Sequence, residues 1–236
     1  FVGMGLQGFA ASMIFGMGAV FANIIGMTNQ QGSIFLASFT IANVVMQYPI
    51  GRMSDRFDRR LIILIVASIS ALAAAIASIV GLSNYWTLLG LTAIFGGFSM
   101  TIYSLCIAHA NDYLSPSQMV GTASALITVN GIGAIFGPPI IAALVDLFGS
   151  YMFFAMLSAV HIGLGLFVLA RMYMREAVPA EAQGPFIAVP DQGTAVAASL
   201  NPETAWSELD PELVATKDPL TDNPYLDMPS LQKPSK

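Results

Sequence analysis

Long tracts without charge restrict what this chain can fold into. Residues 1–51, 61–108 and 113–145 contain no Asp, Glu, Lys, Arg or His, and residues 147–170 contain only His161 among these types. A soluble domain must wet its surface with polar groups, so tracts of this length exclude one of ordinary composition. A spanning helix needs about 20 apolar residues. The tracts therefore predict an all-α membrane protein with two, two, one and one transmembrane helices.

Short polar turns divide and bound these tracts. Thr28 followed three residues later by Gln31 predicts a capping box at a helix start. Ser115 followed by Pro116 predicts another helix start, with Ser as N-cap and Pro at the first helical position. Gly149 is expected to end the fifth span. The predicted spans are 5–27, 32–50, 61–81, 86–109, 116–145 and 151–171.

The basic residues lie on one side of the predicted membrane. Four Arg fall within 52–60, Arg171 and Arg175 close the sixth span, and the three Lys follow it, whereas the turns near 28–31, 82–85 and 146–150 have none. The positive-inside rule assigns the arginine side to the cytoplasm. Both ends of the chain are then expected to be cytoplasmic.

Residues 176–236 differ from the rest of the chain in composition. They carry ten acidic residues against three Lys and are rich in Pro. We expect a six-helix bundle over 1–175 and a disordered cytoplasmic tail over 176–236, because the tail has little apolar surface to offset the entropy of ordering. A docking segment around Trp206 and Leu209 is the alternative for part of the tail. Since Phe1 is not an initiator Met, the chain is expected to be a fragment or a natural half.

The loop between the second and third spans, Gly-Arg-Met-Ser-Asp-Arg-Phe-Asp-Arg-Arg, holds the most specific motif. Its Gly51, Asp55, Arg56, Arg59 and Arg60 resemble the loop signature Gly-x-x-x-Asp-Arg-x-x-Arg-Arg of the major facilitator superfamily. Any cytoplasmic loop collects Arg, but these types in register between charge-free spans are far harder to obtain by chance. The resemblance covers about 1–175 and implies a secondary transporter of a small solute, built from two six-helix halves.

The acidic segment after the sixth span resembles a C-terminus, so the spans resemble helices 7–12, and the missing N-terminal half is an expected partner. Residues 108–112, the Gly-Pro segment of the fifth span and residues 186–190 resemble the bacterial YcaD-like branch, which implies the cell inner membrane. A six-helix interaction or scaffold protein that transports nothing remains the alternative.

The resemblance implies a gating role for the motif. Asp55 is expected to face the positive end of a helix dipole from the other half. Arg56, Arg59 and Arg60 are expected to pair with acidic groups and with anionic membrane lipid. Gly51 would let the helix end pack closely.

The fifth span carries a Gly-Pro segment. Gly133 and Gly137 lie four residues apart, so a neighbouring helix can approach their shared face. Pro138 and Pro139 remove two backbone donors and are expected to bend the helix. The segment resembles the Gly-Pro motif of drug antiporters, and we predict a packing site and hinge.

Uncharged polar residues are the candidates for solute contact. In this family the first and fourth spans line the cavity, which favours Gln7, Asn23, Thr101 and Tyr103. Ordinary hydrogen bonding between helices is the alternative for each.

The spans lack the clustered acids, bases or nucleophiles that an enzyme needs, so neither catalysis nor a cofactor is predicted. His109 and Asp112 lie three residues apart and are read as a helix-end pair, a gate or part of a metal site, but two ligands make a poor metal site and no metal is predicted. No nucleic-acid partner is expected either. Coupling to protons stays open, and its carboxylate is expected in the missing half.

Overall fold

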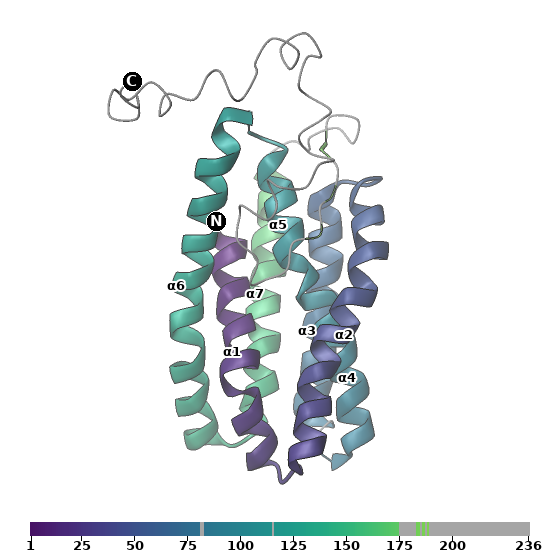
Figure 1. Ribbon diagram of the computed structural model, residues 1–236, viewed down its shortest axis with the longest axis vertical. Helices are drawn as coiled ribbons and strands as arrows, with labels where there is room; N and C mark the ends of the chain where they lie inside the picture. Colours follow the sequence, from purple (N-terminus) through teal and green to yellow (C-terminus); the bar gives the residue numbers. More distant parts are fainter. Residues whose placement is uncertain (81–82, 115, 175–182, 185, 187, 189–236) are drawn as a thin grey trace, which may run out of the picture. The chain divides into compact units, whose positions relative to one another are not determined.

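The structure is a computed structural model that describes residues 1–80, 83–114, 116–174, 183–184, 186 and 188 (Figure 1). Its helices are α1 (Val2–Ile24), α2 (Asn29–Ser54), α3 (Arg59–Ile79), α4 (Tyr85–Ser99), α5 (Thr101–Asn111), α6 (Pro116–Phe148) and α7 (Met152–Met174). The chain divides into two compact units, Phe1–Ala195 and Val196–Lys236, and the second lies outside the described residues. The predicted docking segment around Trp206 therefore cannot be compared with the structure.

Six helical segments are long and apolar enough to cross a membrane, with α4 and α5 together forming one of them. This confirms the predicted all-α architecture, and the ends agree within a few residues. The capping box is also confirmed: the Thr28 backbone N–H donates to Gln31 Oε1 at 2.9 Å, and the Gln31 N–H donates to Thr28 Oγ1 at 3.2 Å. The predicted cap at Ser115 lies outside the described residues.

The fourth span was predicted as one helix over 86–109 but is interrupted at Met100. The interruption is local, because the Met100 N–H still donates to the Gly96 carbonyl at 3.2 Å. The Thr101 hydroxyl donates to the Gly97 carbonyl at 2.8 Å, and such side-chain bonds compete with the helical backbone pattern. Composition gives no sign of this one-residue break.

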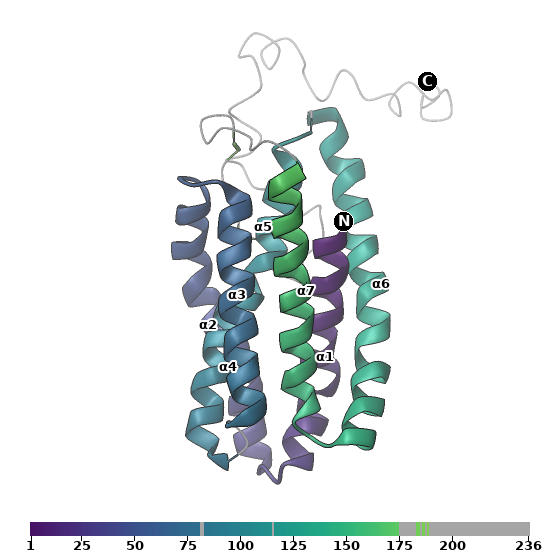
Figure 2. The same cartoon turned by 180° about the vertical axis from the view of Figure 1, so that it is seen from behind.

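The helices are arranged in two layers. Helices α1, α2 and α6 lie on one side of the bundle and α3 and α7 on the other, as the two opposite views show (Figures 1 and 2). The turns at Gly26 and Gly149 lie at one end of the bundle. Residues 52–60, 112–114 and Arg171 lie at the other, which we call the arginine end. The described arginines are therefore gathered at one end, as the sequence predicted.

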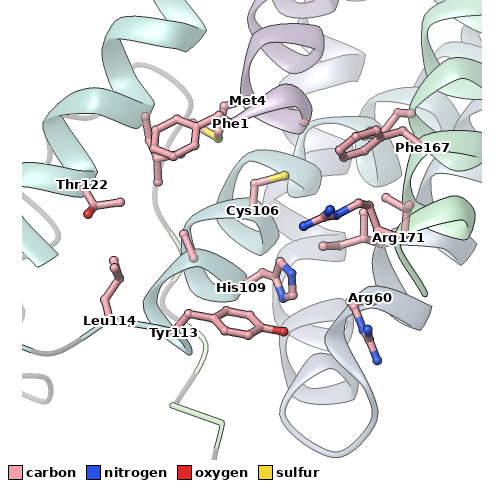
Figure 3. Close-up of a pocket in the computed structure, with 16 residues that line it drawn as sticks. Phe1, Met4, Arg60, Cys106, His109, Tyr113, Leu114, Thr122, Phe167 and Arg171 are labelled. Carbon is pink, nitrogen blue, oxygen red and sulfur yellow. The ribbon is translucent and has the colours of Figure 1, made fainter. Parts of the chain in front are cut away.

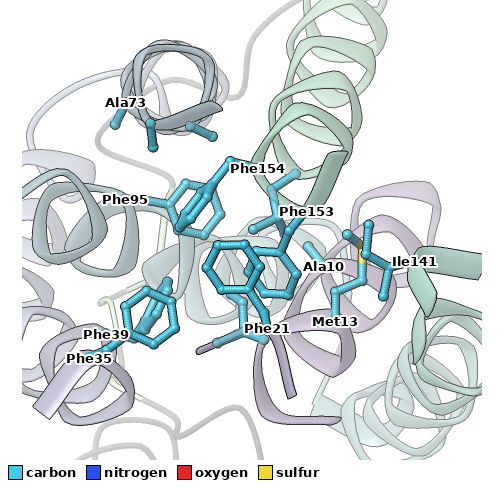
Figure 4. Close-up of a cluster of buried hydrophobic side chains, with 14 of the residues drawn as sticks. Ala10, Met13, Phe21, Phe35, Phe39, Ala73, Phe95, Ile141, Phe153 and Phe154 are labelled. Carbon is cyan, nitrogen blue, oxygen red and sulfur yellow. The ribbon is translucent and has the colours of Figure 1, made fainter. Parts of the chain in front are cut away.

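An aromatic cluster forms the core away from the arginine end (Figure 4). The Phe21 ring stacks on Phe153 with centroids 4.3 Å apart and meets Phe154 edge-on at 5.5 Å. Burying rings of this size gives about 1.5–3 kcal/mol each in water, but in lipid the gain comes from tight packing instead. The cluster draws on α1, α2, α4 and α7 and so fixes the two layers against each other.

His161 on α7 is a structural residue. Its Nδ1 lies 2.7 Å from the Leu157 carbonyl oxygen, and its Nε2 lies 2.8 Å from the Ser99 hydroxyl of α4. Because a carbonyl can only accept, Nδ1 carries the proton, and the Ser99 hydroxyl donates to Nε2. The ring thereby joins α7 to α4.

Candidate gating site

Arg59 lies at the centre of a polar cluster at the arginine end. Its side chain is only 1% exposed, and it donates from Nη1 to Asp112 Oδ1 at 2.7 Å, from Nη2 to Asp55 Oδ1 at 3.4 Å and from Nε to Ser54 Oγ at 3.1 Å. The Asp58 carboxylate accepts from the Arg60 N–H at 2.9 Å and so caps α3, which places Arg59 at the first position of the helix. A buried guanidinium is tolerated only when it is paired. The cluster thus joins the ends of α2, α3 and α5.

The other two arginines of the motif are placed differently. The Arg60 guanidinium donates two hydrogen bonds to the Asp58 carboxylate, from Nε to Oδ1 at 3.2 Å and from Nη2 to Oδ2 at 3.0 Å. Burial acts to raise the pKa of Asp58, but the hydrogen bonds and charge of Arg60 outweigh it and hold that pKa below its ordinary 3.8. Arg56 is exposed. Arg59 and Arg60 are thus both buried, at 1% and 8% exposure, and of the two it is Arg59 that bonds to Asp55 and Asp112.

Part of the chain that follows α7 is seated on this cluster. Gly184 accepts from Arg59 Nη2 at 2.8 Å through its carbonyl and donates its N–H to Asp112 Oδ1 at 3.1 Å. The Phe186 N–H donates to Asp55 Oδ1 at 2.7 Å. The Phe186 ring lies over Gly51, where a Cβ would collide with it. Asp55 is therefore engaged within the chain itself, whereas its predicted contact with the other half stays a prediction.

Sequence reasoning missed these contacts because it assigned everything after 175 to a disordered tail. The prediction is wrong for Gly184 and Phe186, which bond to the bundle; most of 176–236 lies outside the described residues. A signal was present, since the glycine and the aromatic residue sit in a short apolar stretch before the acidic part of the segment. Their target could not be predicted, because the hydrogen bonds span 72 to 131 residues of sequence.

Asp112 is the least exposed carboxylate of the cluster, with 2% of its side chain accessible. Burial raises its pKa above the ordinary 3.8, and the neighbouring charge of Asp55 raises it further, against the opposing effects of Arg59 and the Gly184 N–H. His109 is not its partner: that ring packs edge-on against Tyr113, with centroids 5.3 Å apart. Among the described residues, no three His, Cys, Asp or Glu gather as metal ligands would. Asp112 instead pairs with Arg59 and with the Gly184 N–H, and its role as a gate stays a prediction.

The glycines of the Gly-Pro segment lie against α1. A Cβ at Gly133 would collide with the Gly5 carbonyl, and one at Gly137 with the Ser12 side chain and, at 2.6 Å, the Phe9 carbonyl. Pro138 and Pro139 are both inside α6, which continues through them to Phe148. The close approach of α1 to α6 therefore depends on glycine, while the hinge stays a prediction.

The four candidate cavity residues are not brought together. Gln7 and Tyr103 are each 1% exposed and Thr101 is 0% exposed, whereas Asn23 is exposed. Side chains that line a cavity between two halves are exposed when one half is seen alone, so the burial of the first three argues against that position. Thr101 bonds instead to Gly97 and, at 3.4 Å, to Asn43 of α2. Both amide atoms of Gln7 are buried and have no hydrogen-bond partner among the residues that the structure describes.

A cavity of about 370 Å³ opens beside the cluster at the arginine end (Figure 3). Arg60, Arg171, His109 and Tyr113 supply its polar lining, and residues such as Phe167 supply an apolar wall. The Arg60 charge is already satisfied by Asp58, as described above. The cavity is thus a mildly basic, largely apolar space next to the Arg59 cluster.

Comparison with known proteins shows which family has this architecture. A family model described as "Major Facilitator Superfamily" matches residues 1–222. The chain belongs to the major facilitator superfamily. The predicted resemblance is thereby confirmed, and the chain is assigned to a family of multi-pass membrane transporters.

Curated relatives from the same superfamily agree with the predicted branch. The "Uncharacterized MFS-type transporter YcaD" of Escherichia fergusonii is 24% identical over 172 residues, which are 73% of this chain and 42% of the relative. YcaD of Escherichia coli K12 is 26% identical over the same shares. The chain therefore spans less than half the length of these major facilitator relatives.

A solved structure shows the same fold. The human organic anion transporter MFSD10 (TETRAN) aligns with a TM-score of 0.58 at 20% sequence identity, covering 80% of this chain and 49% of that one. At this identity the likeness concerns the fold alone.

Proposed function

We propose that this chain forms the C-terminal half of a secondary transporter that moves a small solute by alternating access. The observation that carries the proposal is the cluster around Arg59, which ties the ends of α2, α3 and α5 through side-chain bonds. Alternating access requires contacts at one membrane face that hold a closed state and break when the halves rock apart. The bonds of the cluster lie within this half, where they hold Asp55 in position for such a contact. The position of the cluster in the family's signature loop supports this role.

Orientation follows from the same end of the molecule. By the positive-inside rule the arginine end is cytoplasmic, in the inner membrane of a bacterial cell. The motif then acts as a cytoplasmic gate. Asp55 has 40% of its side chain exposed, which leaves it accessible to a helix end of the missing half.

The exposed helices α2 and α6 are the best candidates for contact with that half. Their apolar windows are only 22% and 17% buried, the least of the six spans. Each displays a row of apolar side chains, with Ile41, Val44 and Val45 on α2 and Ile132, Ile135 and Phe136 on α6. These rows suit either lipid or a second bundle, and we assign part of them to the missing half.

The solute is a small molecule. If protons drive its transport, the coupling carboxylate lies in the missing half, because Asp112 is paired with Arg59 at 2.7 Å. Within the described spans the only acid is Asp146, which is exposed near the end of α6.

The test uses the whole transporter in proteoliposomes with a panel of radiolabelled organic anions, sugars and amino acids. Asp55→Asn should impair transport while leaving the inserted amount unchanged, because losing a charge–dipole contact of about 0.3–2 kcal/mol shifts a balanced equilibrium severalfold. Asp146→Asn, at the opposite end of the bundle, is the matched control. Equal transport by both variants would count against the gate, and no saturable transport of any solute would favour the scaffold alternative.

A further inference from the structure

We propose that Gly184 and Phe186 form a removable clasp that holds the gate closed. The clasp occupies a peptide-docking surface made by Gly51 and Asp55 of the α2 end, Arg59 of α3 and Asp112 beyond α5. This inference rests on the proposed gating function but is tested independently of transport.

The docking surface has a shortage of donors that the clasp supplies. Two carboxylates, Asp55 and Asp112, share one guanidinium, that of Arg59. Asp112, with 2% of its side chain accessible, must find its donors within the protein, because water reaches it poorly. The N–H groups of Gly184 and Phe186 each give one carboxylate a further donor, at 3.1 and 2.7 Å. The Gly184 carbonyl in turn accepts from Arg59 at 2.8 Å.

The apolar contact gives the surface its selectivity. The Phe186 ring occupies the space that a side chain at position 51 would need. The absence of a side chain at Gly51 and the ring of Phe186 are therefore complementary in shape. The surface fits a peptide segment with two N–H donors two residues apart and a ring at the second.

The clasp is selective for one state of the gate. It bonds to the α2 end through Asp55 and to the α5 end through Asp112, so both carboxylates must be close together for it to seat fully. Both sets of contacts lie within this half, so a movement inside the bundle that separates the α2 end from the α5 end breaks one of them. A segment that binds one state better than the other shifts the population toward that state. The seated clasp therefore stabilises the closed cytoplasmic end, and its removal favours opening.

Hydrogen exchange tests whether the clasp is seated. In the whole transporter in lipid nanodiscs, the amides of Gly184 and Phe186 should exchange at least roughly tenfold more slowly than amides near the chain's end, because each is held by a carboxylate. Asp55→Ala should release the Phe186 amide first, and Asp112→Ala the Gly184 amide. Exchange of both amides at unprotected rates in the wild-type protein would overturn the clasp.

Thiol labelling tests whether the clasp holds the gate. Ser54 accepts from Arg59 Nε and is 0% exposed, so Ser54→Cys on a Cys106→Ser background reports opening from the cytoplasmic side of inside-out vesicles. Adding Phe186→Ala should speed labelling roughly tenfold, the equivalent of losing most of one buried ring. Tyr173→Ala, which removes an exposed aromatic residue at 86%, is the matched control and should change nothing.

A double-mutant cycle guards against a general folding defect. Gly51→Ala should also speed labelling, because its methyl group displaces the ring, but it should add nothing once Phe186→Ala is present. Additive effects, or equal labelling with and without Phe186, would overturn the proposal. Since no solute is needed, a seated clasp in a protein that transports nothing would refute the proposed function while sparing the docking surface.

Discussion

Arg59 shows how one residue of a loop motif acquires its partners. The motif predicts an arginine near a carboxylate, and Asp55 is four residues away, across the turn that joins α2 to α3. The stronger pair, with Asp112, joins residues that are 53 positions apart and is shorter by 0.7 Å (3.4 against 2.7 Å). No local pattern announces that pair. The sequence therefore named Arg59 among three arginines and Asp112 as one possible gate residue, but it could not predict that the two side chains pair.

The raised pKa of Asp112 predicts how the stability of the protein depends on pH. Its folded pKa lies above the unfolded value of about 3.8, so the native state binds this proton more tightly. The stability contributed by the group is then fully present below the unfolded pKa and is lost as pH rises through the folded pKa. Thermal unfolding in detergent should show a loss of stability from acidic to neutral pH that is smaller in Asp112→Asn. Parallel pH profiles for the two proteins would contradict the assignment.

At the scale of elements, the spans were predictable and their contacts were not. Charge-free tracts and the Thr28–Gln31 cap locate helix ends because these signals are local. The break at Met100 depends on a hydroxyl that bonds one turn back, and the pairing of α1 with α6 depends on where glycines face after folding. Such features require the neighbouring helix to be known.

The close contact between α1 and α6 predicts how glycine substitutions in α6 change stability. Gly133→Ala should lower the unfolding temperature in detergent, because its Cβ meets the Gly5 backbone, and overpacking costs about 1–3 kcal/mol. Gly131→Ala, two residues away with open space around it, should be neutral or stabilising by up to about 1 kcal/mol. Equal effects of the two substitutions would show that the helices do not approach closely at Gly133.

At the scale of the whole molecule, the one-sided arginines predict orientation. Arg56 and Gln30 are both exposed, at opposite ends of the bundle. Single cysteines at these positions on a Cys106→Ser background would be probed with an impermeant thiol reagent in intact cells. We expect labelling at Gln30→Cys and none at Arg56→Cys until the membrane is permeabilised. The reverse pattern would place the gate outside.

The central claim is that this chain is half of a transporter. One half presents only half of a cavity lining, whereas each span satisfies its own backbone hydrogen bonds and should insert unaided. The decisive measurement is uptake of a solute carried by the whole protein, with residues 1–236 expressed alone and together with the upstream half as a separate polypeptide. We predict saturable uptake only when both halves are present. Saturable uptake by residues 1–236 alone would contradict the account and indicate a carrier assembled from six-helix copies.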